Sequence, residues 1–290
     1  MKLAYYPGCS LDGTGVEYGK STRAVFARLG VELEDLPGWT CCGATSAHAT
    51  SSYLSVALPL RNLSLAEALG RDVLVPCAAC FNAMRRAGAA ARAVAAGGGS
   101  EEERHAVTEV AATTGRACTG KFRAVHPLEF LSAGDGAKLL KEQVSRPLEG
   151  LRIAPYYGCL LLRPAREIGF DDPERPQSMG RVLRALGAEP VTWSGHVDCC
   201  GASLGISSPD LVTTLTVRLQ GQARRAGAAA IVTACPLCQT NLEGRGGKSR
   251  LPVFFITELV GLALGLKTTR SWLRRHLVNP FPLLRSLKLA

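Results

Sequence analysis

Ten of the eleven cysteines in this 290-residue chain fall into two groups with the same internal order. Each group has a lone cysteine, an adjacent pair and a Cys-x2-Cys motif. The spacing is Cys-x31-CysCys-x34-Cys-x2-Cys in the first group and Cys-x39-CysCys-x34-Cys-x2-Cys in the second. The first group is Cys9, Cys41, Cys42, Cys77 and Cys80, and the second is Cys159, Cys199, Cys200, Cys235 and Cys238. Thiolates gathered in this way are ligands for soft transition metals and for iron–sulfur clusters.

The beginning of the sequence does not resemble an export signal, because Pro7 and Gly8 break its short apolar run. We therefore expect a cytoplasmic protein whose thiols stay reduced, so that clustered cysteines bind metal rather than form disulfides. The apolar segment 251–266 contains Glu258 and is too short to predict a membrane span.

The ligand pattern favours iron–sulfur clusters over structural zinc. A structural zinc ion is bound by four ligands, whereas each group offers five thiols. Two adjacent cysteines chelate one tetrahedral ion poorly, but they can bind different irons of a cluster. Structural zinc in at least one half remains the alternative.

The chain carries a formal net charge of +10, which would offset the negative charge of thiolate-bound clusters. Nucleic-acid binding is not expected, because aromatic residues make up only 6% of the chain and the Lys and Arg residues are dispersed.

The positions of the cysteines follow from a repeated alternation of strands and helices. The sequence predicts strands at 2–6, 31–36, 72–76 and 122–126 in the first half, and at 151–157, 189–193, 229–234 and 252–256 in the second. Helical patterns between them predict an α/β fold of two pseudo-symmetric units, each a small parallel sheet with flanking helices. The cysteines then follow the carboxyl ends of neighbouring strands, which is the edge where such sheets build their sites.

We expect an N-terminal unit at 1–148, a C-terminal unit at 149–266 and a basic tail at 267–290. A helical insertion at about 84–118 interrupts the first unit; it is either a solvated surface excursion or an arm that docks a partner. About eight extra residues in the second unit fall in the loop 169–177. The tail interleaves basic residues with Trp272, Leu273, Phe281 and Leu283, as a membrane-surface helix or a docking segment would. Pro280 and Pro282 favour docking.

The doubled pattern, with Cys41-Cys42-Gly43 and Cys199-Cys200-Gly201, resembles the CCG-domain family and most of all the catalytic B-type component of heterodisulfide reductase. Similar CCG pairs occur in subunits of several flavin dehydrogenases, so the motif specifies the metal centre better than the substrate. The resemblance implies that each group of five cysteines holds one non-cubane [4Fe-4S] cluster and that all ten cysteines are catalytic ligands.

The resemblance further implies an iron–sulfur oxidoreductase that reduces a disulfide, or in reverse oxidises thiols. The alternatives are a sulfur-oxidising version acting on lipoate or sulfane sulfur, and an electron-transfer subunit of a flavin dehydrogenase passing electrons towards quinone. The chain has neither a ferredoxin-type cysteine run nor a G-x-G-x-x-G motif after a strand. Electrons are therefore expected from partners, an iron–sulfur C-type subunit and a flavin-containing A-type subunit by resemblance.

The source of protons is not evident from the sequence. His48 and His196 lie near the cysteine pairs, and a structural role is the simpler interpretation of each. Cys118 has no counterpart in the repeat and is expected to be a buried structural thiol.

Overall fold

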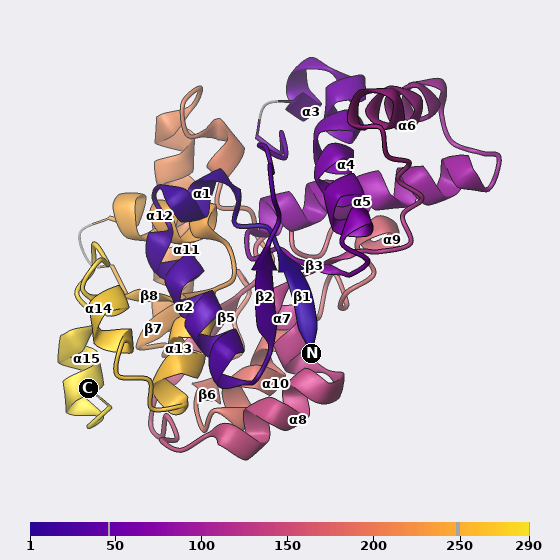
Figure 1. Cartoon of the computed structure of the whole chain (residues 1–290). Coiled ribbons are helices and arrows are strands. Elements are labelled where there is room, and N and C mark those ends of the chain that lie inside the picture. Colours follow the sequence, from indigo (N-terminus) through magenta and orange to yellow (C-terminus); the bar gives the residue numbers. More distant parts are fainter. Residues whose placement is uncertain (46, 248–249, 290) are drawn as a thin grey trace.

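The computed structural model describes residues 1–45, 47–247 and 250–289 and contains two four-stranded sheets (Figure 1). In the first sheet the order is β2-β1-β3-β4, formed by Glu32–Asp35, Lys2–Tyr5, Val73–Leu74 and Ala124–Val125. In the second it is β6-β5-β7-β8, formed by Glu189–Pro190, Arg152–Tyr156, Ala230–Thr233 and Val253–Phe255. All neighbouring strands pair in parallel. The predicted α/β class with two parallel sheets is confirmed.

Helices follow the strands in the same order in both units. The first unit contains α1 (Gly8–Asp12), α2 (Val16–Arg28), α3 (Ala47–Thr50), α4 (Ser52–Ala68), α5 (Ala78–Ala95), α6 (Glu101–Thr114), α7 (Pro127–Ser132) and α8 (Gly134–Gln143). The remainder contains α9 (Ala165–Ile168), α10 (Ser178–Ala185), the 3-10 helix η1 (Ala202–Leu204), α11 (Pro209–Arg225), α12 (Pro236–Arg245), α13 (Ile256–Ala263), α14 (Thr269–Leu273) and α15 (Phe281–Ser286). The loop 169–177 lies between α9 and α10, in the region where extra residues were expected.

The two units pack against each other through two equivalent pairs of helices. Helix α2 of the first unit lies on α13 of the second, and α10 of the second lies on α7 of the first. At the first of these contacts, Ser21 and Thr257 share a buried hydroxyl hydrogen bond of 2.6 Å. One continuous hydrophobic core therefore runs through both sheets rather than stopping at the boundary between them.

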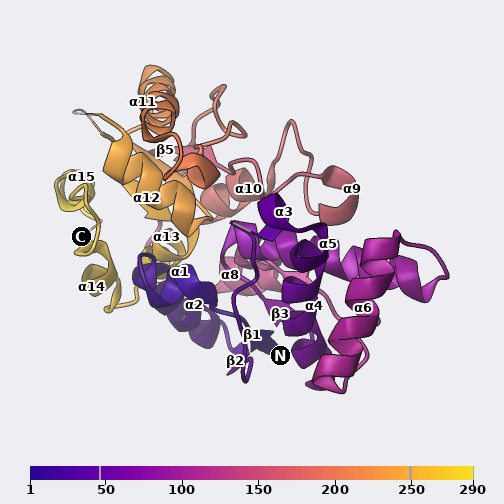
Figure 2. The same cartoon turned by 90° about the horizontal axis from the view of Figure 1, so that it is seen from above.

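The helical pattern at 84–96 continues the helix that begins with the first Cys-x2-Cys motif, so α5 has 18 residues where α12 has 10. After a glycine-rich turn, α6 starts with a capping box formed by Ser100 and Glu103 and packs against α4. Ala106 and Val110 are buried while most of α6 faces outward. Figure 2 shows α6 at the end of the molecule opposite to α14 and α15.

The basic tail folds onto its own chain through part of its apolar residues. Trp272, Leu273 and Leu284 are buried, and α14 packs against α2 and α13. Burying these side chains removes apolar surface from water and holds the tail on the core, whereas Phe281 and Leu283 are only half-buried. Within the described residues, no helix is both long and apolar enough to cross a bilayer.

Candidate metal centre

Both groups of cysteines lie beyond the carboxyl ends of three adjacent strands, as the sequence predicts. The first cysteine of each Cys-x2-Cys motif, Cys77 or Cys235, is the N-cap of a helix, α5 or α12. Cys80 and Cys238 then fall in the first turn, where the helix dipole favours thiolate. Cys9, Cys41 and Cys199 are exposed, Cys159 is half-buried, and the other six members of the two groups are buried.

Sulfur atoms from different loops approach each other in each unit. In the first, the Sγ atoms of Cys42 and Cys80 are 3.1 Å apart. In the second, the equivalent atoms of Cys200 and Cys238 are 3.4 Å apart, and the Sγ atoms of Cys159 and Cys199 are 3.5 Å apart. The fold thus assembles the two predicted groups with closely similar geometry.

The glycine of each CCG triplet supports the preceding thiol. The N–H of Gly43 donates to Cys41 Sγ at 3.4 Å, and the N–H of Gly201 donates to Cys199 Sγ at 3.2 Å. Both glycines have φ near the left-handed helical region, +70° and +76°. A backbone donor aimed at sulfur stabilises the thiolate form, which is the form that binds metal.

The glycine that precedes the lone cysteine leaves space beside another ligand. A Cβ atom on Gly8 would lie 3.2 Å from Cys80 Sγ, and one on Gly158 would lie 3.2 Å from Cys238 Sγ. The tyrosine two positions before each of these glycines, Tyr6 or Tyr156, holds the backbone beside the adjacent cysteines. Tyr6 donates to the carbonyl of Thr40 at 2.9 Å, and Tyr156 donates to that of Asp198 at 2.8 Å. These carbonyls immediately precede the adjacent cysteines, so the repeated Tyr, Gly and Cys form one local support.

Contacts between sulfur atoms lower the pKa of some of these thiols and raise the pKa of others. The hydrogen bond with Cys80 lowers the pKa of Cys42 to about 7, and the one with Cys159 lowers the pKa of Cys199 to about 6. The contacts with Cys42 and Cys199 raise the pKa values of the partner thiols, Cys80 and Cys159, and the loss of water around these thiols raises them further. Each unit therefore offers at least one thiol that ionises readily at neutral pH, as metal binding requires.

A pocket of about 160 Å³ opens between the units. Its walls contain all five cysteines of the second group together with Cys42 of the first. Leu160 and Leu237 form apolar parts of the wall. The basic side chains of His48 and Arg86 also line it. The arrangement can hold a small group against sulfur ligands from both units.

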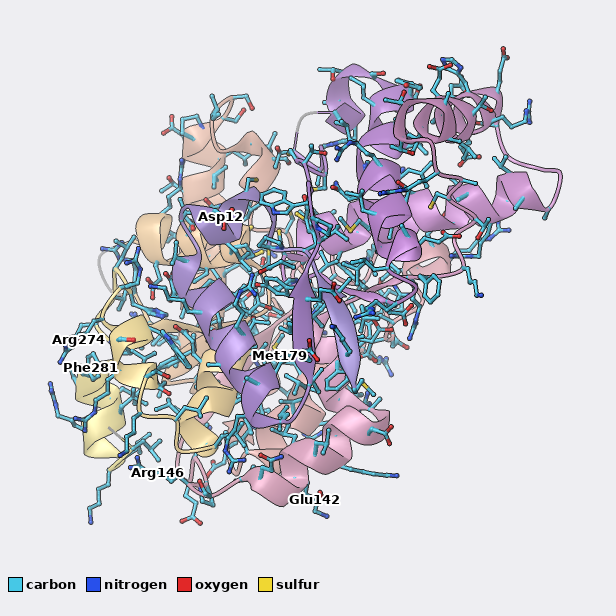
Figure 3. The ribbon with its side chains drawn as sticks, viewed as in Figure 1. Asp12, Glu142, Arg146, Met179, Arg274 and Phe281 are labelled. Atoms are coloured by element: carbon cyan, nitrogen blue, oxygen red, sulfur yellow. The ribbon has the colours of Figure 1, made fainter. Side chains whose placement is uncertain are left out.

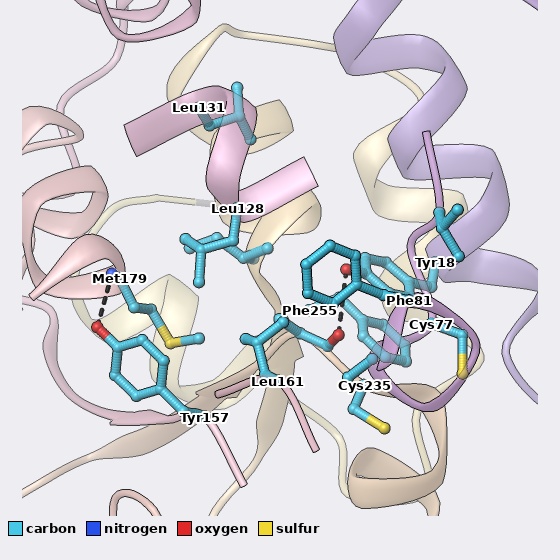
Figure 4. Packing of buried hydrophobic residues seen from close by; sticks show 14 of the residues in the cluster. Tyr18, Cys77, Phe81, Leu128, Leu131, Tyr157, Leu161, Met179, Cys235 and Phe255 are labelled. Atoms are coloured by element: carbon cyan, nitrogen blue, oxygen red, sulfur yellow. Dashed lines mark hydrogen bonds between the residues drawn. The ribbon is translucent and has the colours of Figure 1, made fainter. Parts of the chain in front are cut away.

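The innermost thiols of the two groups also meet. A hydrogen bond between Cys77 and Cys235 contributes most to a pKa of Cys77 far below its usual value. Cys77 and Cys235 are both buried, and they lie close together beside Phe81 and Phe255 (Figure 4). The two candidate metal sites are thus neighbours.

Of the other residues that the sequence singles out, His48 lies at the pocket, whereas His196 and Cys118 do not line it. His48 lines the pocket, but both ring nitrogens of His196 lie at backbone carbonyls, Trp193 at 2.8 Å and Glu174 at 3.1 Å. Cys118 is buried away from both groups, and burial raises its pKa to about 12. The sequence reasoning missed Asn82 and Arg86 on α5; their positions two and six residues after Cys80 place them on the pocket side of the helix.

The donor set of each group suits an iron–sulfur site, because every member is a thiol. Among the described residues, no three His, Cys, Asp or Glu side chains are grouped so as to hold one metal ion. The thiols instead form close pairs spread around each strand edge. Sulfur-rich donor sets of this kind are typical of iron–sulfur sites, and the CCG motifs suggest iron–sulfur binding.

The chain is similar to subunits of known reductases. The chain is 30% identical over 286 residues to the 8-methylmenaquinol:fumarate reductase membrane anchor subunit of Wolinella succinogenes, with 96% of this chain and 97% of that protein aligned. It is 28% identical over 289 residues to the B-type component of the ferredoxin/F420H2-dependent CoB-CoM heterodisulfide reductase of Methanosarcina acetivorans, with 96% and 94% aligned. These relatives are subunits of multisubunit reductases.

A solved structure shares the fold. A hypothetical protein from Helicobacter pylori superposes with a TM-score of 0.71 at 12% identity, over 95% of this chain. The chain spans about half (51%) of the length of that protein. The model of the cysteine-rich CCG domain matches residues 3–85 and 153–243, which include every cysteine of the two groups. The chain therefore belongs to the CCG cysteine-rich domain family, and it carries two copies of the domain.

Proposed function

We propose that this chain is the catalytic subunit of a heterodisulfide reductase-like complex. In this proposal it reduces a disulfide with two electrons, or oxidises thiols in the reverse direction. The observation that carries the proposal is the pocket whose walls combine Cys42 of the first group with the whole second group. A site between two metal centres suits a substrate that is itself a pair of sulfur atoms.

The proposed ligands of one non-cubane [4Fe-4S] cluster are Cys9, Cys41, Cys42, Cys77 and Cys80, within a unit at 1–148. The proposed ligands of the second are Cys159, Cys199, Cys200, Cys235 and Cys238, within a unit at 149–266. The absence of a side chain at Gly8 and Gly158 leaves room for a cluster next to Cys80 and Cys238.

Clusters held by these two groups of cysteines would supply the two electrons that break the sulfur–sulfur bond. The balance is one disulfide, two electrons and two protons giving two thiols. Leu160 and Leu237 give the pocket apolar walls, while Arg86 provides positive charge that would stabilise a thiolate as it forms. His48 lines the same pocket and is the proposed proton donor.

The electrons would come from partner subunits, an iron–sulfur C-type subunit and a flavin-containing A-type subunit, in a cytoplasmic complex. The substrate would be a small or carrier-bound disulfide. Lipoate or sulfane sulfur would be handled at the same site in a sulfur-oxidising version of the complex.

The proposal is tested with C42S and C200S, one substitution in each group. Each should lower iron and acid-labile sulfide, change the EPR spectrum and abolish disulfide turnover. C118S is the matched control, because Cys118 lies outside both groups, and it should keep the iron, the spectrum and the turnover. Full activity in either C42S or C200S contradicts the proposal.

A second candidate is an electron-transfer subunit that works at a membrane surface. Its support is the similarity to a fumarate reductase membrane anchor subunit, together with a basic surface on the tail. Two neighbouring cavities of about 370 and 280 Å³ share Arg270 and Phe281. The walls of the larger cavity are rich in leucine, and the rims of the two carry Arg146, Lys267, Arg270, Arg274 and Arg285. Figure 3 shows Arg146, Arg274 and Phe281 on the same side of the molecule. Cationic rims over apolar walls suit anionic phospholipid headgroups.

This candidate predicts co-sedimentation with phosphatidylglycerol vesicles but not with phosphatidylcholine vesicles. The combined variant R270E/R274E/R285E should lose binding. A control with the exposed Arg224 and Arg225 of α11 changed to Glu should keep most of it. EPR during turnover separates the two functions, because an electron relay shows no signal that depends on the disulfide.

A further inference from the structure

One histidine holds the backbone in front of both Cys-x2-Cys motifs. His126 follows β4 and is the N-cap of α7. Its Nε2 atom lies 2.7 Å from the carbonyl oxygen of Pro76 and 3.1 Å from that of Ala234. Pro76 immediately precedes Cys77, and Ala234 immediately precedes Cys235. The same side-chain atom therefore contacts the equivalent backbone position of both units.

The hydrogen bonds define which ring nitrogen carries the proton. The backbone N–H of Leu128 donates to His126 Nδ1 at 3.1 Å, so Nδ1 is the acceptor. Nε2 then carries the hydrogen of the neutral ring and shares it between the two carbonyls. His126 is fully buried, and the ring of Phe81 packs edge-on at 5.5 Å. A buried donor with no competing water holds its acceptors more strongly than an exposed one does.

The second unit carries a phenylalanine at the position equivalent to this histidine. Phe255 follows β8 and is the N-cap of α13, as His126 is for α7, and both helices carry a glutamate at the third position. Phe255 stacks on Tyr18 of the first unit, with ring centres 4.3 Å apart and planes 3° apart (Figure 4). The Tyr18 hydroxyl adds a further donor to the Ala234 carbonyl at 3.4 Å. Both side-chain donors that reach the Ala234 carbonyl thus come from the first unit.

We propose that His126 is a positioning residue that couples the two metal sites, by holding the backbone of both Cys-x2-Cys turns with one shared hydrogen bond. The inference rests on the proposed clusters at the two groups of cysteines. It predicts two effects. The shared bond fixes the separation of the centres, and its donor dipole favours the more reduced, more negative state of both.

Two substitutions separate this role from the helix cap that His126 also provides. In H126N the amide oxygen can replace Nδ1 as the acceptor for Leu128, but the side chain is too short to reach both carbonyls. In H126Q the terminal amide nitrogen falls close to the position of Nε2 and can keep the donor, while the cap is lost. H126N should therefore lose the shared hydrogen bond that couples the two metal sites, and H126Q should retain more of it.

The measurement is a redox titration of the purified, iron-loaded chain followed by EPR. In H126N both midpoint potentials should move in the negative direction together, and the magnetic interaction between the centres should weaken. N241L is the single-site control, because the Asn241 amide donates to the Cys200 carbonyl at 3.3 Å and lies 3.7 Å from Cys200 Sγ. It should move only one potential.

The outcomes remain distinct from those of the proposed function. A wild-type chain without iron and sulfide refutes the proposed clusters themselves. If the wild type is loaded and H126N loses only stability or occupancy, with unchanged potentials and coupling in the loaded molecules, the positioning role is wrong. A shift of one potential alone in H126N also contradicts it.

Discussion

At the scale of single residues, the site depends on glycines whose roles differ although their backbones look alike. Gly8 and Gly30 both have positive φ, +69° and +75°. A Cβ atom on Gly30 would meet nothing within 4 Å, whereas one on Gly8 would press on Cys80 Sγ and the Tyr6 ring. The pair therefore separates the backbone requirement for glycine from the requirement for space at the metal site.

We expect G8A and G30A to share a backbone penalty of about 1–2 kcal/mol in the free energy of unfolding. Only G8A should also lower the iron content, since its methyl group displaces a proposed ligand. Chemical denaturation and iron analysis of both variants provide the measurement. Equal iron content in the two would show that Gly8 serves the turn alone.

At the scale of elements, the tail is held by a buried charged group. His276 lies between Glu243 of α12 and Glu258 of α13, with nitrogen–oxygen distances of 3.0 Å to each. All three side chains are completely buried. Burial by itself lowers the pKa of His276, but the two glutamates outweigh burial and raise it from 6.5 to about 10. The imidazolium therefore connects the tail to the helix that carries the second Cys-x2-Cys motif.

This raised pKa predicts the direction of a pH effect. The stabilisation from His276 is fully present below pH 6.5. It is lost as the pH rises towards 10, because the folded state then releases the proton that it binds more tightly than the unfolded state does.

H276Q should lower the free energy of unfolding by about 3–5 kcal/mol at neutral pH, since two buried carboxylates lose their partner. Unfolding curves between pH 6 and 10 should converge for wild type and H276Q. The exposed H105Q should keep the wild-type pH profile, and parallel curves for H276Q would contradict the assignment.

At the scale of the whole molecule, residues of one unit support the site of the other. Asn82 on α5 donates to the carbonyls of Leu160 at 2.7 Å and Arg163 at 2.6 Å, both in the loop that carries Cys159. Asn62 on α4 makes comparable bonds within its own unit, to the carbonyl and N–H of Thr40 beside Cys41. Asn82 therefore acts between the units, whereas Asn62 acts within one of them.

We expect N82A and N62A each to destabilise the chain by about 1–3 kcal/mol, because buried carbonyls lose their donors. N82A should disturb the EPR signal of the second centre, and N62A that of the first. Spectra of the two variants under identical reduction make the comparison. The assignment fails if N82A changes the first centre and leaves the second as in the wild type.

The sequence by itself determined the two groups of cysteines, the eight strands and the duplicated α/β class. Thiol spacing and alternating apolar patterns are local properties, and strand–helix crossovers return the chain to one edge of a sheet. Only the tertiary structure decided what lies between the units: the contact of Cys77 with Cys235, the bridge made by His126, and the tail packed on its own core. The contact of His126 with Ala234 joins residues 108 positions apart. Partners so distant are chosen by packing and hydrogen bonding in the buried junction rather than by any periodicity along the chain.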